Sequence, residues 1–79
     1  MKGYHVTTEK KIERYNKTGC ILLPVRFWPG LYTAKNWAKK TGREVILKID
    51  VIDSHPLPDH IPARFTEHII DKWERINNV

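Results

Sequence analysis

The sequence predicts a small α+β domain with the element order βαβαβα and a short mixed sheet packed by two or three helices. Two kinds of segment follow each other along the chain. In one kind apolar and polar residues alternate, as in half-buried strands, and in the other the apolar residues recur every three or four positions, as in helices. Gly19 and Gly42 each follow a helix-like segment, where a glycine easily adopts the left-handed cap. The 79 residues suffice for a single domain, 1–79, with a small core.

The first strand is expected at about residues 2–6, because Tyr4 and Val6 lie in a short extended run. Thr7 or Thr8 then caps a helix that extends to about residue 17, since a threonine hydroxyl there accepts a hydrogen bond from a free backbone N–H.

A second strand is expected over residues 20–28, interrupted at Pro24, which cannot donate a hydrogen bond to a neighbouring strand. Thr33 is expected to cap a second, shorter helix over about residues 34–41, with Trp37 on its inner side.

The third strand, Glu44 to Ile52, has the clearest alternation and predicts one buried and one partly wet face. Residues 55–60 contain two prolines and predict an irregular loop. A terminal helix is expected after Pro62 because four apolar residues follow a helical spacing: Phe65, Ile69, Trp73 and Ile76.

The composition excludes several classes of protein. With one cysteine, Cys20, the chain forms no internal disulfide. No apolar run approaches the length of a membrane span and the N-terminus is polar, so a cytoplasmic protein without a membrane partner is expected.

Charge is distributed unevenly along the chain. Residues 1–43 contain ten Lys and Arg and two Glu, whereas residues 44–79 contain four Lys and Arg and seven Asp and Glu. Clustered positive charge raises the local concentration of anions, which favours a phosphorylated cofactor or a nucleic-acid backbone as partner. The alternative is a solvated surface with an uneven distribution of charge.

Common catalytic and metal-binding motifs are absent from the sequence: it has no P-loop, no GxGxxG, no HExxH, no CxxC pair and no GxSxG. His55 and His60 flank Asp59 in the proline-rich loop, with His68 further along, but their spacing fits none of the usual zinc sites. We therefore expect no bound metal.

Aromatic residues surround the Pro29-Gly30 turn. Trp28, Tyr32 and Trp37 lie there with Arg26 close by, and flat rings beside a cation are suited to stacking on a base or a nicotinamide. Trp37 has the spacing of a core residue, whereas Trp28 and Tyr32 could serve either purpose.

Four segments together resemble the front half of ADP-ribosyltransferase-like domains, over about residues 3–50. They are Tyr4-His5-Val6-Thr7-Thr8, Thr18-Gly19-Cys20-Ile21, Leu31-Tyr32-Thr33-Ala34-Lys35-Asn36-Trp37-Ala38 and Val45-Ile46-Leu47-Lys48-Ile49. That superfamily includes DNA-modifying toxins and RNA phosphotransferases. The resemblance implies NAD or another phosphorylated nucleotide as ligand, His5 and Thr7 as ribose contacts, and Tyr32 as a nicotinamide-stacking residue, with Arg26 nearby.

Catalytic members of that superfamily carry a glutamate on a late strand. The late candidates here are Glu67 and Glu74, and the apolar spacing places both on the expected terminal helix. Either residues 66–70 form a strand instead, with Glu67 as a candidate catalytic residue, or the domain is catalytically reduced. The helical spacing favours a binding domain.

Two other functions remain open at this point. A nucleic-acid-binding module would use basic residues of the two helices: Lys10, Lys11, Arg14, Lys17, Lys39 and Lys40. A small phage or mobile-element protein that binds another protein would expose a patch at Trp28 and Tyr32. Neither the oligomeric state nor the identity of the ligand follows from the sequence.

Overall fold

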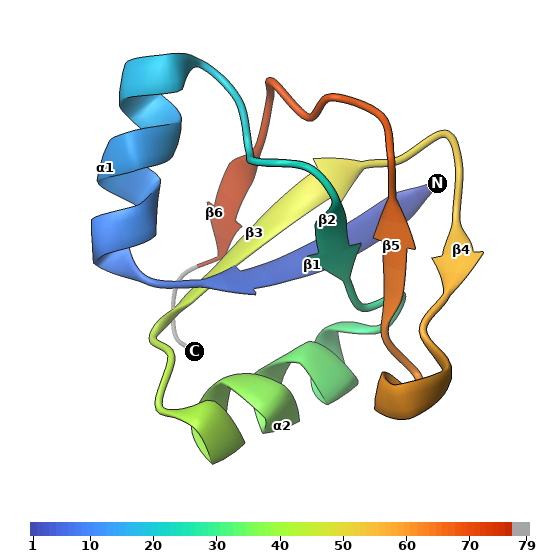
Figure 1. The fold of residues 1–79 in the computed structure, drawn as a ribbon. Helices are drawn as coiled ribbons and strands as arrows, with labels where there is room; N and C mark the ends of the chain where they lie inside the picture. The colour runs from blue at the N-terminus through green and yellow to red at the C-terminus, as the bar shows by residue number, and fades with distance from the viewer. Residues whose placement is uncertain (77–79) are drawn as a thin grey trace.

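A computed structural model describes residues 1–76, which form a small α+β domain of two helices and two three-stranded sheets (Figure 1). The elements follow in this order: β1 (Lys2–Thr7), α1 (Glu9–Thr18), β2 (Val25–Phe27), α2 (Leu31–Thr41), β3 (Val45–Asp50), β4 (His55–Pro56), a 3-10 helix (Pro58–His60), β5 (Arg64–Thr66) and β6 (Glu74–Ile76). The predicted fold class is confirmed.

All strand pairs of the two sheets are antiparallel within residues 1–76, so the expectation of a mixed sheet is wrong. One sheet has the order β1-β3-β6 and the other the order β2-β5-β4. A single bridge joins them, in which the N–H of Tyr4 donates to the carbonyl of Trp28 at 2.9 Å and the N–H of Trp28 donates back at 2.8 Å. This bridge brings β2 alongside β1.

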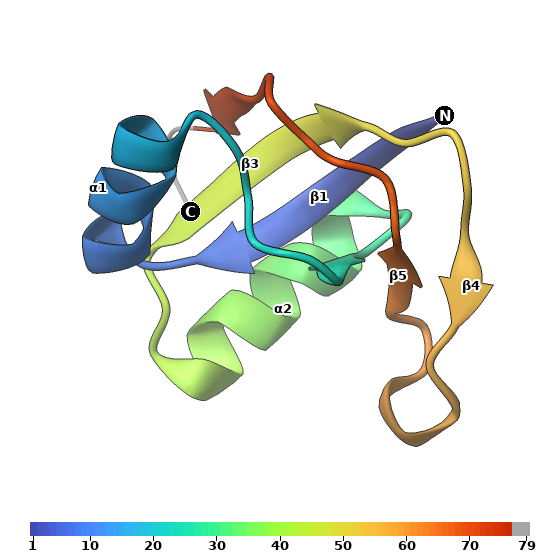
Figure 2. The ribbon, with the colours of Figure 1, turned by 45° about the horizontal axis from the view of Figure 1, so that its top comes forward.

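The sheet β1-β3-β6 is covered on both faces. Figure 2 shows α2 lying along one side of β1 and β3, where Ala34 and Ala38 of α2 pack with Ile46 of β3. On the other face, Leu47 of β3 packs with Phe27 of β2. The alternation predicted for β3 is therefore correct. Its second face is partly wet, as predicted, because Ile46 is buried beneath α2 whereas Lys48 is half-buried and Asp50 is exposed.

Helix α1 begins and ends as its sequence predicts. The hydroxyl of Thr8 accepts a hydrogen bond from the N–H of Lys11 at 3.2 Å, and Gly19 ends the helix in the left-handed region with φ 79°. Local residues thus mark both ends of α1, and the N–H of Glu9 also donates to the carboxylate of Glu44 at 2.9 Å.

Helix α2 starts earlier than expected. Gly30 is its N-cap and Leu31 its first residue, while the hydroxyl of Thr33 donates to the carbonyl of Gly30 at 2.9 Å. Gly42 ends the helix with φ 71°, as predicted. The strand expected over residues 20–28 is reduced to β2.

The C-terminal helix predicted from the apolar spacing is wrong. Residues 64–76 are largely extended: Thr66 of β5 pairs with Val25 of β2, and Ile76 of β6 pairs with Ile46 of β3. Ile69, expected in the core, is 68% exposed, while its neighbour Ile70 is buried. The free edges of β2 and β3 provide backbone partners for this segment, and its β-branched and aromatic residues favour extended structure.

Neither helix among the described residues is long and apolar enough to cross a membrane.

Candidate anion-binding cavity

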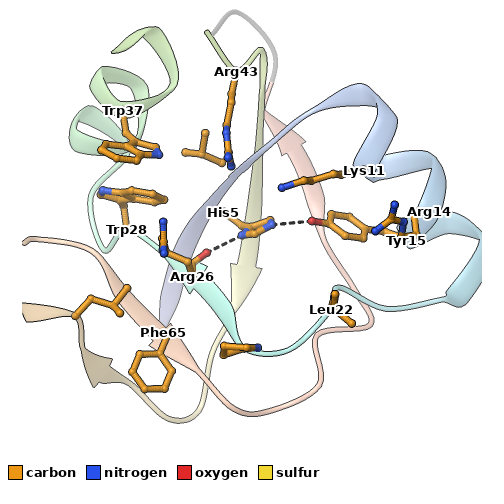
Figure 3. A pocket seen from close by; sticks show the side chains of 13 residues that line it. His5, Lys11, Arg14, Tyr15, Leu22, Arg26, Trp28, Trp37, Arg43 and Phe65 are labelled. Atoms are coloured by element: carbon orange, nitrogen blue, oxygen red, sulfur yellow. Dashed lines mark hydrogen bonds between the residues drawn. The ribbon is translucent and has the colours of Figure 1, made fainter. Parts of the chain in front are cut away.

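A cavity of about 530 Å³ lies where β1, β2, α1 and the turn between α2 and β3 meet (Figure 3). Its volume is in the range of small-molecule binding sites. His5 of β1 lies in its centre, with Tyr15 of α1 on one side and Trp28 on the other (Figure 3).

Four permanent cations line this cavity. Lys11 and Arg14 extend from α1, Arg26 from β2, and Arg43 from the turn that follows α2. Within residues 1–76 no Asp or Glu lines the cavity, and none of the four cations is within 4.0 Å of a carboxylate oxygen. Their charge is therefore available to an anion, and the wall of low dielectric behind them strengthens the attraction.

His5 ties three elements together. Its Nδ1 lies 2.6 Å from the carbonyl oxygen of Arg26, which can only accept, so Nδ1 carries the hydrogen. Its Nε2, 3.1 Å from the hydroxyl of Tyr15, then accepts from that hydroxyl. The hydroxyl of Thr7, 3.3 Å away, donates to Tyr15 in turn. These bonds connect β1, β2 and α1 beneath the four cations.

The tautomer of His5 agrees with its electrostatic environment. Burial of the ring lowers the pKa of His5 from its ordinary 6.5 to about 4, although the hydrogen bond to the Arg26 carbonyl acts in the opposite direction. The positive charges of Lys11, Arg43 and Arg26 lower the pKa further. His5 is therefore neutral at pH 7 and keeps its network of hydrogen bonds.

Backbone groups of β1 also face the cavity. The N–H and carbonyl of Tyr4 point towards Trp28, on the side of β1 opposite to β3. Alternate residues of an edge strand direct their peptide groups to the same side, so those of Val6, which lines the cavity, point the same way. Val6 therefore offers a donor and an acceptor to a ligand.

Aromatic rings form the remaining wall. The rings of Trp28 and Trp37 pack together with centroids 5.6 Å apart and an angle of 31° between their planes. Phe65 of β5 lines the cavity further along (Figure 3). Beside cations, such flat faces can hold a planar ring.

The structure brings together some of the site residues predicted from the sequence. His5 and Arg26 line the same cavity. Thr7 is fully buried, with its hydroxyl bonded to Tyr15. Tyr32 is 77% exposed and lies outside the cavity. The ligand contacts implied for these residues remain predictions.

The late glutamates lie away from the cavity. Glu67 follows β5 directly rather than lying on a helix, its side chain is exposed, and its N–H donates to Asp53 at 3.0 Å. Glu74 is exposed on β6. Neither residue lines the cavity, and a catalytic role for Glu67 remains a prediction.

The basic residues proposed for nucleic-acid binding divide into two groups. Lys11 and Arg14 line the cavity, whereas four others are exposed outside it: Lys10, Lys17, Lys39 and Lys40. Trp28 is only 4% exposed, so the exposed Trp28 and Tyr32 patch expected of a protein-interaction domain is not formed.

Several residues that line the cavity were not among the predicted ligand contacts, and three of them shape the site. Tyr15 could have been suspected, because it is the one aromatic residue on α1. Arg43 extends the basic half of the chain beyond the glycine that ends α2. Phe65 was assigned to a helix that does not form.

Asp53 lies close to two of the histidines that were considered as metal ligands, His55 and His68. Its carboxylate lies 2.9 Å from Nε2 of His55 and 3.7 Å from Nε2 of His68, and accepts from the hydroxyl of Thr66. Among residues 1–76 no three His, Cys, Asp or Glu side chains are arranged to hold a metal ion. This cluster instead fastens β5 to the segment that follows β3.

Comparison of the chain with protein-family models, with curated proteins and with solved structures finds no match.

Proposed function

We propose that this domain binds a phosphorylated nucleotide in the cavity between β1, β2 and α1. The observation that carries the proposal is the convergence of four unpaired cations on a cavity with aromatic walls. Phosphates require positive charge with N–H donors, and a base requires a flat apolar face. A cavity that has cations and flat aromatic walls is therefore suited to a ligand that has phosphates and a base.

Different residues of the cavity would bind the phosphates and the base of such a ligand. Arg26 and Arg43, which both lie near His5 in Figure 3, can each donate two parallel hydrogen bonds to phosphate oxygens. Trp28 and Phe65 offer faces to the base, and the free peptide groups of Val6 can bond to its edge or to the sugar.

His5 has a different role from the one implied by the resemblance to ADP-ribosyltransferases. Both of its ring nitrogens are already bonded within the protein, so it would hold β1, β2 and α1 in place and meet a ligand through the exposed part of its ring. A hydrogen bond from Nε2 to a ribose would first require the hydroxyl of Tyr15 to move. NAD remains one candidate ligand among phosphorylated nucleotides.

Binding is a better-supported function than catalysis. A glutamate that stabilises a cationic transition state must contact the reacting sugar. Among the described residues no carboxylate lines the cavity, and Glu67 is directed to solvent.

Isothermal titration calorimetry with ADP, at low salt and pH 7, tests the proposal. We expect a single site that Arg26→Gln weakens about tenfold, which is the order expected for loss of one charge-assisted hydrogen bond. Lys72→Gln is the matched control, because it removes the same charge from an exposed position outside the cavity. No binding of ADP at millimolar concentration, or equal weakening by both substitutions, would contradict the proposal.

A second candidate is binding of single-stranded nucleic acid, and one observation favours it. Lys10, Arg14 and Lys17 follow each other at helical spacing on the exposed side of α1, so positive charge continues from the cavity across the surface. The affinity for an oligonucleotide should then fall with added salt more steeply than the affinity for ADP. The double substitution Lys10→Gln and Lys17→Gln should reduce that slope without changing ADP binding.

A further inference from the structure

A second cavity, of about 250 Å³, lies beside the first. Trp28 and Trp37 line both cavities, so the pair of indoles forms a shared wall between them. The other walls are the exposed side of α2 and the segment around Ile61, which follows the 3-10 helix.

The side chains of this second cavity suit a planar ring with polar edges. The His60 ring stands edge-on to the Trp37 indole, with centroids 5.7 Å apart and planes at 80°. These two rings form adjacent walls of the cavity. Rings of this kind hold a nucleobase by stacking on its face.

Polar groups lie on the α2 side of the second cavity. Asn36 and Lys40 are four residues apart and therefore project from the same side of α2. Within residues 1–76 the side-chain amide of Asn36 has no hydrogen-bond partner, so its donor and its acceptor are both free for the edge of a base. Lys40 adds a cation for a neighbouring phosphate.

We propose that the second cavity receives a second base of the same ligand, so that the ligand contains two nucleosides joined through phosphate. This inference rests on the proposed function, because it assigns the phosphates and first base to the first cavity. The shared indole wall places the two bases on either side of Trp28 and Trp37, with cations of the first cavity and Lys40 available to the phosphates that connect them.

Two chemical sources provide such a ligand. One is a strand of nucleic acid, in which neighbouring nucleosides share a 3′–5′ phosphodiester. The other is a dinucleotide with a 5′–5′ pyrophosphate. The three adenine probes ADP, 5′-phosphorylated ApA and diadenosine pyrophosphate distinguish them. ADP supplies one base, and the other two probes supply two identical bases joined by different linkages.

Calorimetric titration of the full chain with the three probes tests the inference. We expect at least one of the two-base probes to bind about tenfold tighter than ADP, the order expected for one additional stacked base. The probe that gains identifies the linkage. Asn36→Ala and His60→Ala should each remove most of the gain while leaving ADP binding unchanged.

Asn16→Ala is the matched control, because it makes the same change on the exposed surface of α1, away from both cavities. If ADP binds but neither two-base probe binds more tightly, the inference is wrong and the proposed function stands. The inference is equally wrong if Asn16→Ala reduces the gain as much as Asn36→Ala does. If ADP itself fails to bind, the proposed function falls and the inference with it.

Discussion

The stability of this domain should fall between pH 7 and pH 4 because of His5. In the folded state the pKa of His5 is lowered from 6.5 to about 4, first by burial of the ring and then by the cations Lys11, Arg43 and Arg26. Between these two values the unfolded chain binds a proton at this residue and the folded chain does not. Falling pH therefore favours unfolding, and the loss is complete once the pH is below the folded pKa.

The magnitude follows from the two pKa values. The linkage relation gives a loss of about 1 kcal/mol at pH 6 and about 2 kcal/mol at pH 5, with an upper limit near 3 kcal/mol. A domain of this size has a free energy of unfolding on the order of 4–12 kcal/mol, so the loss is large enough to measure.

The assay is urea denaturation of the wild type and of His5→Asn at several pH values from 7.5 to about 4.5. The amide of asparagine can still donate to the carbonyl of Arg26 but does not titrate in this range. The variant is less stable at pH 7, because the hydroxyl of Tyr15 loses its acceptor. Its disadvantage relative to the wild type should shrink by about 2 kcal/mol at pH 5. A difference between the two proteins that stays constant with pH would refute the reasoning.

Two further substitutions test interactions that hold the fold together. Gly3→Ala should reduce the free energy of unfolding, measured by urea denaturation, by about 1–3 kcal/mol. The reason is steric, because a Cβ at Gly3 would lie 2.5 Å from Cδ2 of the buried Phe27. An unchanged urea midpoint would show instead that the Phe27 ring can move aside. Asp53→Asn should lower the thermal midpoint at pH 7. Burial acts to raise the pKa of Asp53, but hydrogen bonds from the N–H of Glu67 and the hydroxyl of Thr66 outweigh it and hold the pKa well below its usual range. Its contribution is present in full above the unfolded pKa of 3.8 and is lost progressively as the pH falls from there towards the much lower folded pKa, so the difference between the variant and the wild type should narrow steadily below pH 3.8. A difference that does not narrow in acid would contradict this role.

Elements fixed by neighbouring residues could be predicted from the sequence. The hydroxyl of Thr8 and the left-handed Gly19 define α1 within a few residues of chain. The burial of Val45, Leu47 and Ile49 follows from their alternation. In each case the determining interaction or pattern is local, so it can be recognised before the tertiary structure is known.

Elements fixed by residues distant in the sequence could not be predicted in this way. The extended structure around Thr66 depends on pairing with Val25 and on the carboxylate of Asp53. Neither interaction can be recognised from the local spacing of apolar residues. Trp73 illustrates the ambiguity. It packs edge-on against Tyr15, with centroids 6.1 Å apart, as a core residue of a helix also could, but it does so from an extended segment.

The candidate site divides in the same way. His5 and Arg26 could be predicted as site residues from their residue types and their neighbours in the sequence. The contributions of Tyr15 and Arg43 depend on how α1 and the turn after α2 pack around β1, which residue spacing does not encode. The role of His5 also depends on that packing, since its partner Tyr15 comes from another element.

Titration of the ¹⁵N-labelled protein with ADP, followed by amide chemical shifts, tests the central claim most directly. Binding in the cavity between β1, β2 and α1 should produce saturable shifts at Val6, Lys11, Arg26 and Arg43, while the amide of Lys72, outside the cavity, stays in place. If ADP at millimolar concentration leaves the four cavity amides unmoved, or moves Lys72 as much as it moves them, the cavity is not a nucleotide-binding site.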